Sequence, residues 1–133
     1  LRDNQVSDIS PLEGLTSIEF LGLGENQISD ITALAGLTNI RQLGIWRNQI
    51  SDISALAGLT NLEHLDAVVN QISDISPLVA NSGLGDGDSI DIRCNELDLS
   101  PGSDAMRDID TLIQRGVSVT YKPQGPDPYA RVH

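Results

Sequence analysis

The sequence predicts a single α/β solenoid, in which short coils stack so that each coil adds one strand to a parallel sheet. Three observations support this fold class. The phrase Asn-Gln-Val-Ser-Asp-Ile-Ser-Pro-Leu, which begins at Asn4, returns with small changes at Asn26, Asn48 and Asn70, each time after 22 residues. Leu and Ile supply 31 of the 133 residues whereas aromatic residues make up 3%, so the core must be aliphatic and repetitive. The length suits one domain.

Each coil is expected to begin with a short strand and to leave it through a turn at Asn. Alternating apolar residues predict parallel strands at residues 21–23, 43–45, 65–67 and 90–92. One coil cannot bury its apolar face alone, so the eight inward positions of each repeat must be covered by the coils above and below. The Asn side chain after each strand can pair with buried backbone groups, which is a structural role.

The segment after each Asn predicts a helical turn on the convex side. Ser10, Thr32, Ser54 and Ser76 fit helix N-caps, and Pro follows two of them, at the first helical position. Aspartates precede these residues by two positions, at Asp8, Asp30, Asp52 and Asp74. We expect this aspartate column to stabilise turns or caps, and a ladder of bound cations is the alternative.

The period ends near Ala80, and a different pattern follows an insertion at residues 81–88. Residues 103–115 predict a helix with Ser103 as its N-cap and Gly116 as its stop, whose apolar face carries Met106, Ile109, Leu112 and Ile113. Residues 117–121 alternate as a last strand. The expected organisation is therefore repeats over residues 1–99, in about five coils of which the first is truncated, a helix-strand cap over 100–122, and a Pro-rich tail over 123–133. The tail is expected to be disordered or foreign to the native chain.

The repeated phrase resembles the 22-residue leucine-rich repeats of bacterial internalins, most closely at residues 70–78. The resemblance covers about residues 1–121. It implies a right-handed solenoid whose concave sheet binds proteins outside the cell or at its surface. The chain departs from the family pattern because it opens inside a repeat, without a cap helix or a cell-wall sorting motif. These departures suggest a fragment of a longer array, or an uncapped coil that pairs with a second copy in a homodimer.

Charge and composition exclude several classes of partner. The formal net charge of −11 and the sequence pI of about 4.2 would repel phosphate backbones and anionic membranes, so nucleic acid is not an expected partner. No run of 18 apolar residues exists, so membrane insertion is not expected. The single cysteine excludes an intramolecular disulfide bond. No cofactor is expected.

The outward strand positions carry the candidate binding residues. Trp46 and two valines break the polar rule there, and aromatic and Arg side chains in a polar surround are typical of binding hot spots. The predicted partner-binding residues are Phe20, Trp46, Arg47, His64, Asp66, Val68, Val69 and Arg93. The alternatives are a spacer within a larger repeat array and a module that associates with itself.

Catalysis and metal binding find little support in the residues. His64 and Asp66 share a face, but a triad or an open zinc site needs more partners than the two His residues can supply. The loop at residues 85–91 has alternating acids, yet it is too short for a calcium loop. Cys94 is expected to be partly covered and unreactive. The sequence therefore predicts a protein that is not an enzyme.

Overall fold

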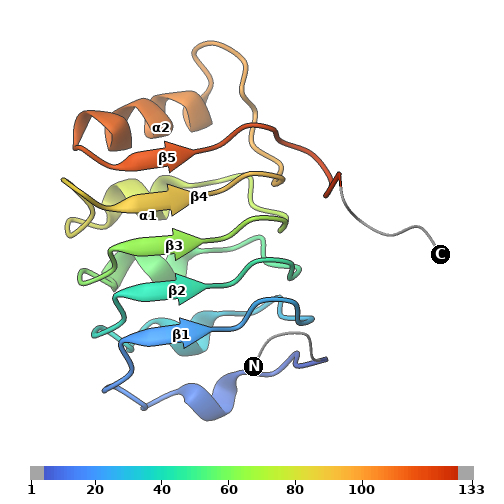
Figure 1. Ribbon diagram of the computed structural model, residues 1–133, viewed down its shortest axis with the longest axis vertical. Helices are drawn as coiled ribbons and strands as arrows, with labels where there is room; N and C mark the ends of the chain where they lie inside the picture. The colour runs from blue at the N-terminus through green and yellow to red at the C-terminus, as the bar shows by residue number, and fades with distance from the viewer. Residues whose placement is uncertain (1–4, 129–133) are drawn as a thin grey trace.

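The computed structural model describes residues 5–128, which form a stack of coils along one axis (Figure 1). Each coil contributes one strand to a five-stranded parallel sheet in which spatial order follows chain order. The strands are β1 (Phe20–Gly22), β2 (Gln42–Gly44), β3 (His64–Asp66), β4 (Ser89–Asp91) and β5 (Ser118–Thr120). This arrangement confirms the predicted solenoid.

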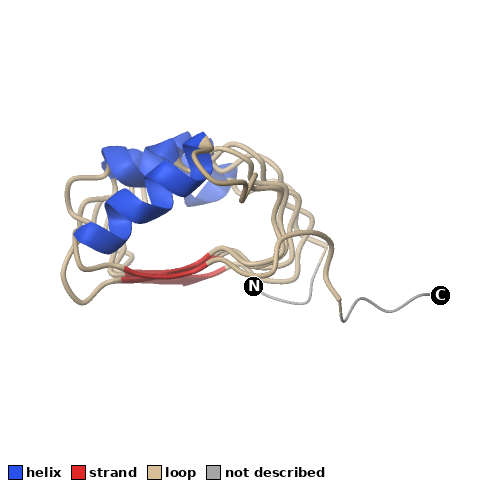
Figure 2. Cartoon of the chain, turned by 90° about the horizontal axis from the view of Figure 1, so that it is seen from above, coloured by secondary structure: helices blue, strands red, loops and turns tan. Residues whose placement is uncertain are grey.

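Short helical segments connect the strands and lie on the opposite side of each coil from the sheet (Figure 2). Four of them follow the repeats and one belongs to the C-terminal cap. They are η1 (Ser10–Leu12), η2 (Thr32–Leu34), η3 (Ser54–Gly58), α1 (Ser76–Ala80) and α2 (Asp104–Gln114). The first three are 3₁₀ turns of three to five residues, a length typical of this tighter helix.

The predicted N-caps of the repeat turns are wrong. Ser10, Thr32, Ser54 and Ser76 are each the first residue of a helical segment, and the isoleucine at the cap position makes no side-chain cap bond. The aspartate two residues earlier accepts the backbone N–H of that Ser or Thr instead, at 2.8–2.9 Å in all four coils. A short carboxylate side chain reaches the N–H two residues ahead more readily than a hydroxyl does. The expected turn role of the aspartate column is therefore confirmed.

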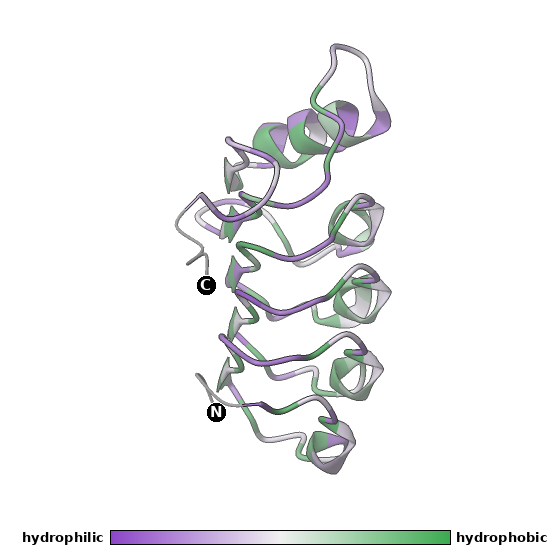
Figure 3. Cartoon of the chain, turned by 90° about the vertical axis from the view of Figure 1, so that its right-hand side faces the viewer, coloured by the Kyte–Doolittle hydropathy of each residue, from purple (hydrophilic) through white to green (hydrophobic). Residues whose placement is uncertain are grey.

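The core is a set of aliphatic columns between the sheet and the helical turns. Leu21, Leu43, Leu65, Ile90 and Val119 are register partners along the sheet, and equivalent columns follow from the turns. Most of the columns are almost completely buried, and Figure 3 shows that hydrophobic and hydrophilic residues alternate along the coils and α2. Each coil thus buries its leucines and isoleucines against its neighbours, as the period predicted.

The asparagines form a continuous hydrogen-bonded ladder beside the strands. The Asn48 side chain accepts the Ile28 N–H at 3.0 Å and donates to the carbonyl oxygens of Leu23 and Ile45, at 3.0 and 3.1 Å. Asn70 and Asn95 repeat this pattern one coil further on. These amides pair with backbone groups of two coils at once, so the expected structural role is confirmed.

The C-terminal cap has the predicted helix and strand. The Ser103 hydroxyl accepts the Met106 N–H at 3.1 Å, and β5 extends the sheet by pairing with β4. The predicted apolar face is wrong at Ile113, which is 46% exposed. Ile113 lies about 100° around the helix from Leu112, and the buried face consists of Ala105, Ile109 and Leu112.

Residues 123–128 of the predicted tail, which we call the strap, hydrogen-bond to the last coil. The Cys94 N–H donates to the Pro123 carbonyl at 2.8 Å, and the Gly125 N–H donates to the Asn95 carbonyl at 3.0 Å. The Gln124 amide continues the asparagine ladder: it accepts the Leu97 N–H at 3.1 Å and donates to the carbonyls of Ile92 and Tyr121. The strap therefore supplies hydrogen-bond partners for backbone groups of the last coil. Residues 129–133 of the predicted tail lie outside the described residues.

None of the helices within residues 5–128 combines the length and the apolar character that a membrane crossing requires.

Candidate functional site

The outward side chains of the strands line an open groove of about 550 Å³, which we call the sheet groove. It runs over all five strands. Its side chains include Phe20, Gln42, Trp46, His64, Asp66, Ser89, Asp91 and Thr120. Because adjacent coils present equivalent positions, the groove is built from columns of side chains about 4.8 Å apart, and its chemistry is set by residues that packing leaves free.

Trp46 is the only tryptophan and lies flat on the sheet. It is half-buried rather than exposed, which corrects the expectation of an exposed ring. The reason is the pair of glycines beneath it: a Cβ atom at Gly24 or Gly44 would overlap the indole ring. The ring therefore occupies the space that two side chains would otherwise fill, and it presents one face to the groove.

His64 and Asp66 occupy outward positions of β3 but do not form an acid-base pair. The His64 Nδ1 lies 2.7 Å from the Ser89 hydroxyl on β4. Within residues 5–128, no carboxylate hydrogen-bonds to the imidazole, so the serine and histidine lack the orienting group of a triad. The contact therefore links the outward side chains of β3 and β4.

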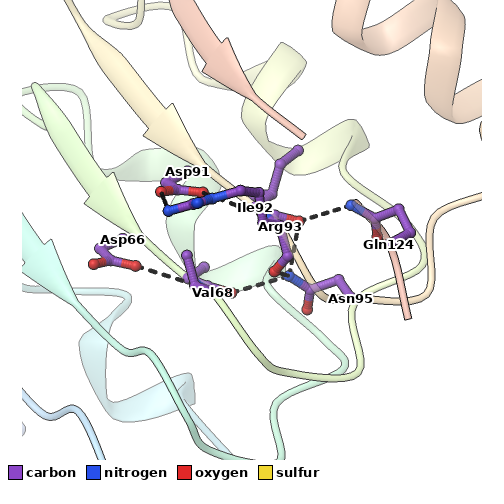
Figure 4. A network of polar contacts seen from close by, with 8 residues as sticks. Asp66, Val68, Asp91, Ile92, Arg93, Asn95 and Gln124 are labelled. Carbon is purple, nitrogen blue, oxygen red and sulfur yellow. Dashed lines mark hydrogen bonds and ion pairs between the residues drawn. The ribbon is translucent and has the colours of Figure 1, made fainter. Parts of the chain in front are cut away.

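The Asp66 carboxyl lies where its charge is disfavoured. Although the residue keeps substantial exposure, partial loss of hydration raises its pKa, and the Asp91 carboxylate on the next strand adds to this rise. A hydrogen bond from the Val68 N–H at 3.2 Å and the positive charge of Arg93 act in the opposite direction (Figure 4). Arg93 itself pairs with Asp91 at 2.8 Å. The outward positions thus bring the carboxyl groups of Asp66 and Asp91 near each other, and Arg93 forms an ion pair with Asp91.

A second depression of about 470 Å³ lies beside the sheet groove, where the strands end and the strap crosses them. We call it the strand-end pocket. It is lined by Glu25, Trp46, Arg47, Asp66, Val68, Val69, Arg93, Cys94, Pro123, Asp127 and Pro128. The Arg47 guanidinium pairs with the Asp127 carboxylate at 3.0 Å, so the strap supplies part of the wall.

The turn that leads out of each strand places one residue in the left-handed region. Glu25, Arg47, Val69 and Cys94 have φ angles between 53° and 61°, and each directly precedes a ladder asparagine. This conformation is unusual for residues other than Gly and Asn, and is most costly for the β-branched Val69. It turns Arg47 and Val69 into the strand-end pocket.

The structure divides the predicted site residues between two adjoining surfaces. Phe20 and His64 line the sheet groove, whereas Trp46 and Asp66 line both the groove and the pocket. Arg47, Val68, Val69 and Arg93 line the pocket alone. The outward alternation of the strands also predicts that Gln42 and Ser89 line the groove. No local sequence pattern predicts that Asp127, which belongs to the strap, lines the pocket.

Two other predicted features have structural outcomes. Cys94 is buried, with 7% of its surface exposed, as a covered thiol requires. Across the part of the chain that the structure describes, no group of three or more His, Cys, Asp or Glu residues is placed to hold a metal ion.

Comparison with known proteins gives one family and several solved relatives. The model of the family Leucine Rich repeats (2 copies) matches residues 1–36 and 38–80. Internalin C2 from Listeria monocytogenes superimposes with a TM-score of 0.71 at 37% identity, over 89% of this chain and 48% of that one. An internalin encoded by inlF in the same organism gives a TM-score of 0.75 at 35% identity, over 95% of this chain and 35% of that one.

A leucine-rich-repeat protein from Leptospira interrogans shares the fold at 17% identity, with a TM-score of 0.65 over 93% of this chain and 36% of that one. The chain spans less than half the length of each of these three proteins. No curated protein matches the sequence. The family match covers more than half of the residues and agrees with the stacked coils and the parallel sheet. The chain therefore belongs to the leucine-rich-repeat family, and its repeats are of the internalin-like class found in bacteria.

Proposed function

We propose that this chain binds a protein partner across the sheet groove and does not act as an enzyme. Leucine-rich-repeat proteins are generally protein-interaction modules. The observation that carries the proposal is Trp46, whose ring is held flat over Gly24 and Gly44 with one face toward the groove. A rigid aromatic side chain loses little conformational freedom on binding, which is why such residues dominate interface energetics.

The polar residues around Trp46 define the chemistry of the partner. Gln42 on β2 and His64 on β3 supply polar side chains to the groove. Asp66 and Asp91 give the groove an acidic character that Arg93 offsets only in part. We expect the partner surface to carry hydrogen-bond donors and at least one basic side chain near these aspartates. The net charge of −11 would raise the association rate with such a partner at low salt.

The test compares a double variant at the binding surface with a control variant on the opposite side of the coil. The double variant Trp46→Ala, Val68→Asp removes the aromatic anchor and puts a charge in the strand-end pocket beside the groove. Ala35→Asp puts the same charge at the exposed end of η2. Partners are captured from extracts at physiological salt, then purified and titrated by calorimetry. We expect the double variant to weaken binding at least tenfold, the effect of about 1.4 kcal/mol, and the control to leave the affinity unchanged.

The outcome depends on both variants being folded, which urea unfolding verifies. An affinity that survives the loss of Trp46 and the new charge at Val68 would contradict binding through the groove. A partner that fails to bind this chain at all but binds longer relatives would favour the spacer function.

Self-association is a second candidate, because the first coil leaves apolar side chains accessible. Leu15 and Phe20 are 49% and 62% exposed, although the residues equivalent to Leu15 in the next coils, Leu37 and Leu59, are fully buried. Two such ends could pair in a symmetric dimer. Light scattering between low and high micromolar concentration checks this: a dimer mass that Leu15→Glu returns to the monomer value supports it, and a constant monomer mass contradicts it.

A further inference from the structure

We propose that the strand-end pocket is a specificity pocket for an acidic, proline-flanked segment of the partner, and that Asp127 and Pro128 of the strap take the place of that segment in the free protein. The inference deepens the proposed function and rests on it. The occupant is an extended segment with Asp or Glu beside Pro, which takes the place of the chain's own Asp127.

The strap already shows which chemistry the pocket accepts. The Asp127 carboxylate lies 3.0 Å from the Arg47 guanidinium, and its side chain is only 11% exposed, whereas that of Arg47 is 46% exposed. Pro128 lines the pocket beside it. A carboxylate in this position has therefore given up most of its contact with water in return for an arginine, an exchange that a partner carboxylate could repeat.

Two of the eight basic residues of the chain, Arg47 and Arg93, line this depression together with the acidic Glu25, Asp66 and Asp127. Arg93 is paired with Asp91, so Arg47 is the cation that a partner carboxylate would meet. Val68 and Val69 add apolar surface between the two arginines, which suits the ring of a proline. The pocket still encloses about 470 Å³ with the strap in place, so an incoming segment has room to enter beside Asp127 before it replaces it.

The beginning of the strap is joined to the last coil by several hydrogen bonds, whereas its end has fewer backbone donors. Pro123, Gln124 and Gly125 make the backbone and amide bonds that complete the asparagine ladder. Beyond Gly125, which has a φ angle of 110°, two of the next three residues are prolines and have no N–H to donate. The Arg47–Asp127 ion pair is one contact that holds this end. An exchange at residues 126–128 therefore leaves the fold intact.

The test uses the full chain and a peptide with the sequence of residues 123–128, acetylated and amidated, and a matched peptide with Asn in place of Asp. Binding is followed by the indole N–H signal of Trp46, which is unique because the chain has one tryptophan and the peptides have none. Asp127→Ala releases the strap. Asp110→Ala removes one exposed carboxylate from α2, outside the pocket, as the control.

We expect the acidic peptide to bind the Asp127→Ala chain about two- to fivefold more tightly than the unchanged chain or the control, because the Arg47–Asp127 ion pair no longer competes. The Asn peptide should bind each chain more weakly than the acidic one, and adding Arg47→Gln should remove this difference. Equal affinity for the two peptides, or no gain on release of Asp127, would overturn the proposal. Neither result depends on a partner, so the groove test with Trp46 and Val68 can succeed or fail separately.

Discussion

Two glycines determine where the aromatic anchor of the groove lies. They are Gly24 and Gly44, which lie beneath the Trp46 ring. Gly22 is the register partner of Gly44 on β1 but does not lie beneath the ring. Gly44→Ala should lift the ring into solvent and shift its fluorescence emission to longer wavelength, because the new Cβ atom would occupy the position of the indole. Gly22→Ala is the matched control, since a Cβ there meets nothing within 4 Å. An identical emission shift in both variants would mean that the glycines do not position the ring.

A second prediction at the residue scale concerns the strained turn at Val69. Its φ angle of 61° places a β-branched residue in the left-handed region, which costs about 1–2 kcal/mol for residues with a Cβ atom and less for Asn. Val69→Asn should therefore raise the free energy of unfolding by about 1 kcal/mol, measured in urea. The same substitution at Val68, which has no positive φ angle, should give no increase. A loss of stability in Val69→Asn would show that side-chain packing outweighs the backbone strain.

The helical turns derive part of their stability from the aspartate column, and this part depends on pH. The N–H groups of Thr32 and Ser54 donate to Asp30 and Asp52, which lowers the pKa of each carboxyl group below its ordinary value near 3.8. A carboxyl with a lowered pKa in the folded state stabilises the fold above the ordinary value, and this contribution disappears as the pH falls through the lowered one. The melting temperature should therefore fall below about pH 4.

Asp52→Asn tests this origin because the amide oxygen can still accept the Ser54 N–H but does not titrate in this range. The variant should lose less stability than the unchanged chain between pH 4 and pH 2.5, followed by circular dichroism at several pH values. Asp110→Asn removes an exposed carboxylate on α2 and should keep the original pH dependence. Identical pH profiles for Asp52→Asn and the unchanged chain would exclude the turn bond as the cause.

The elements differ in how far the sequence predicts them. The repeat period places strands and core columns correctly because the same inward positions must be filled in every coil. The strap was not predictable in this way, since Gln124 continues the asparagine ladder with a longer side chain and after the whole of α2. The half-buried state of Trp46 depends on glycines in two coils, so outward alternation along one strand could predict its side but not its contact with the sheet.

At the scale of the molecule, the stacking of coils makes stability depend on position along the solenoid. Leu15 and Leu37 occupy the same place in consecutive repeats, yet Leu15 is 49% exposed and Leu37 is fully buried. Within residues 5–128, the first coil is therefore covered on one side only, whereas inner coils are covered on both, and α2 with β5 covers the other end. In a chain whose coils contact only their neighbours, unfolding should begin at the less covered end.

Hydrogen exchange and two matched substitutions test this gradient. The Leu12 amide, which donates to the Ile9 carbonyl in the first coil, should exchange faster than the equivalent Leu56 amide, which donates to the Ile53 carbonyl in the third. Leu37→Ala should cost about 2–5 kcal/mol of unfolding free energy because it leaves a cavity between two coils, whereas Leu15→Ala should cost less than about 1 kcal/mol. If the two amides exchange at one rate and the two substitutions cost the same, the coils unfold as a single cooperative unit despite their unequal coverage.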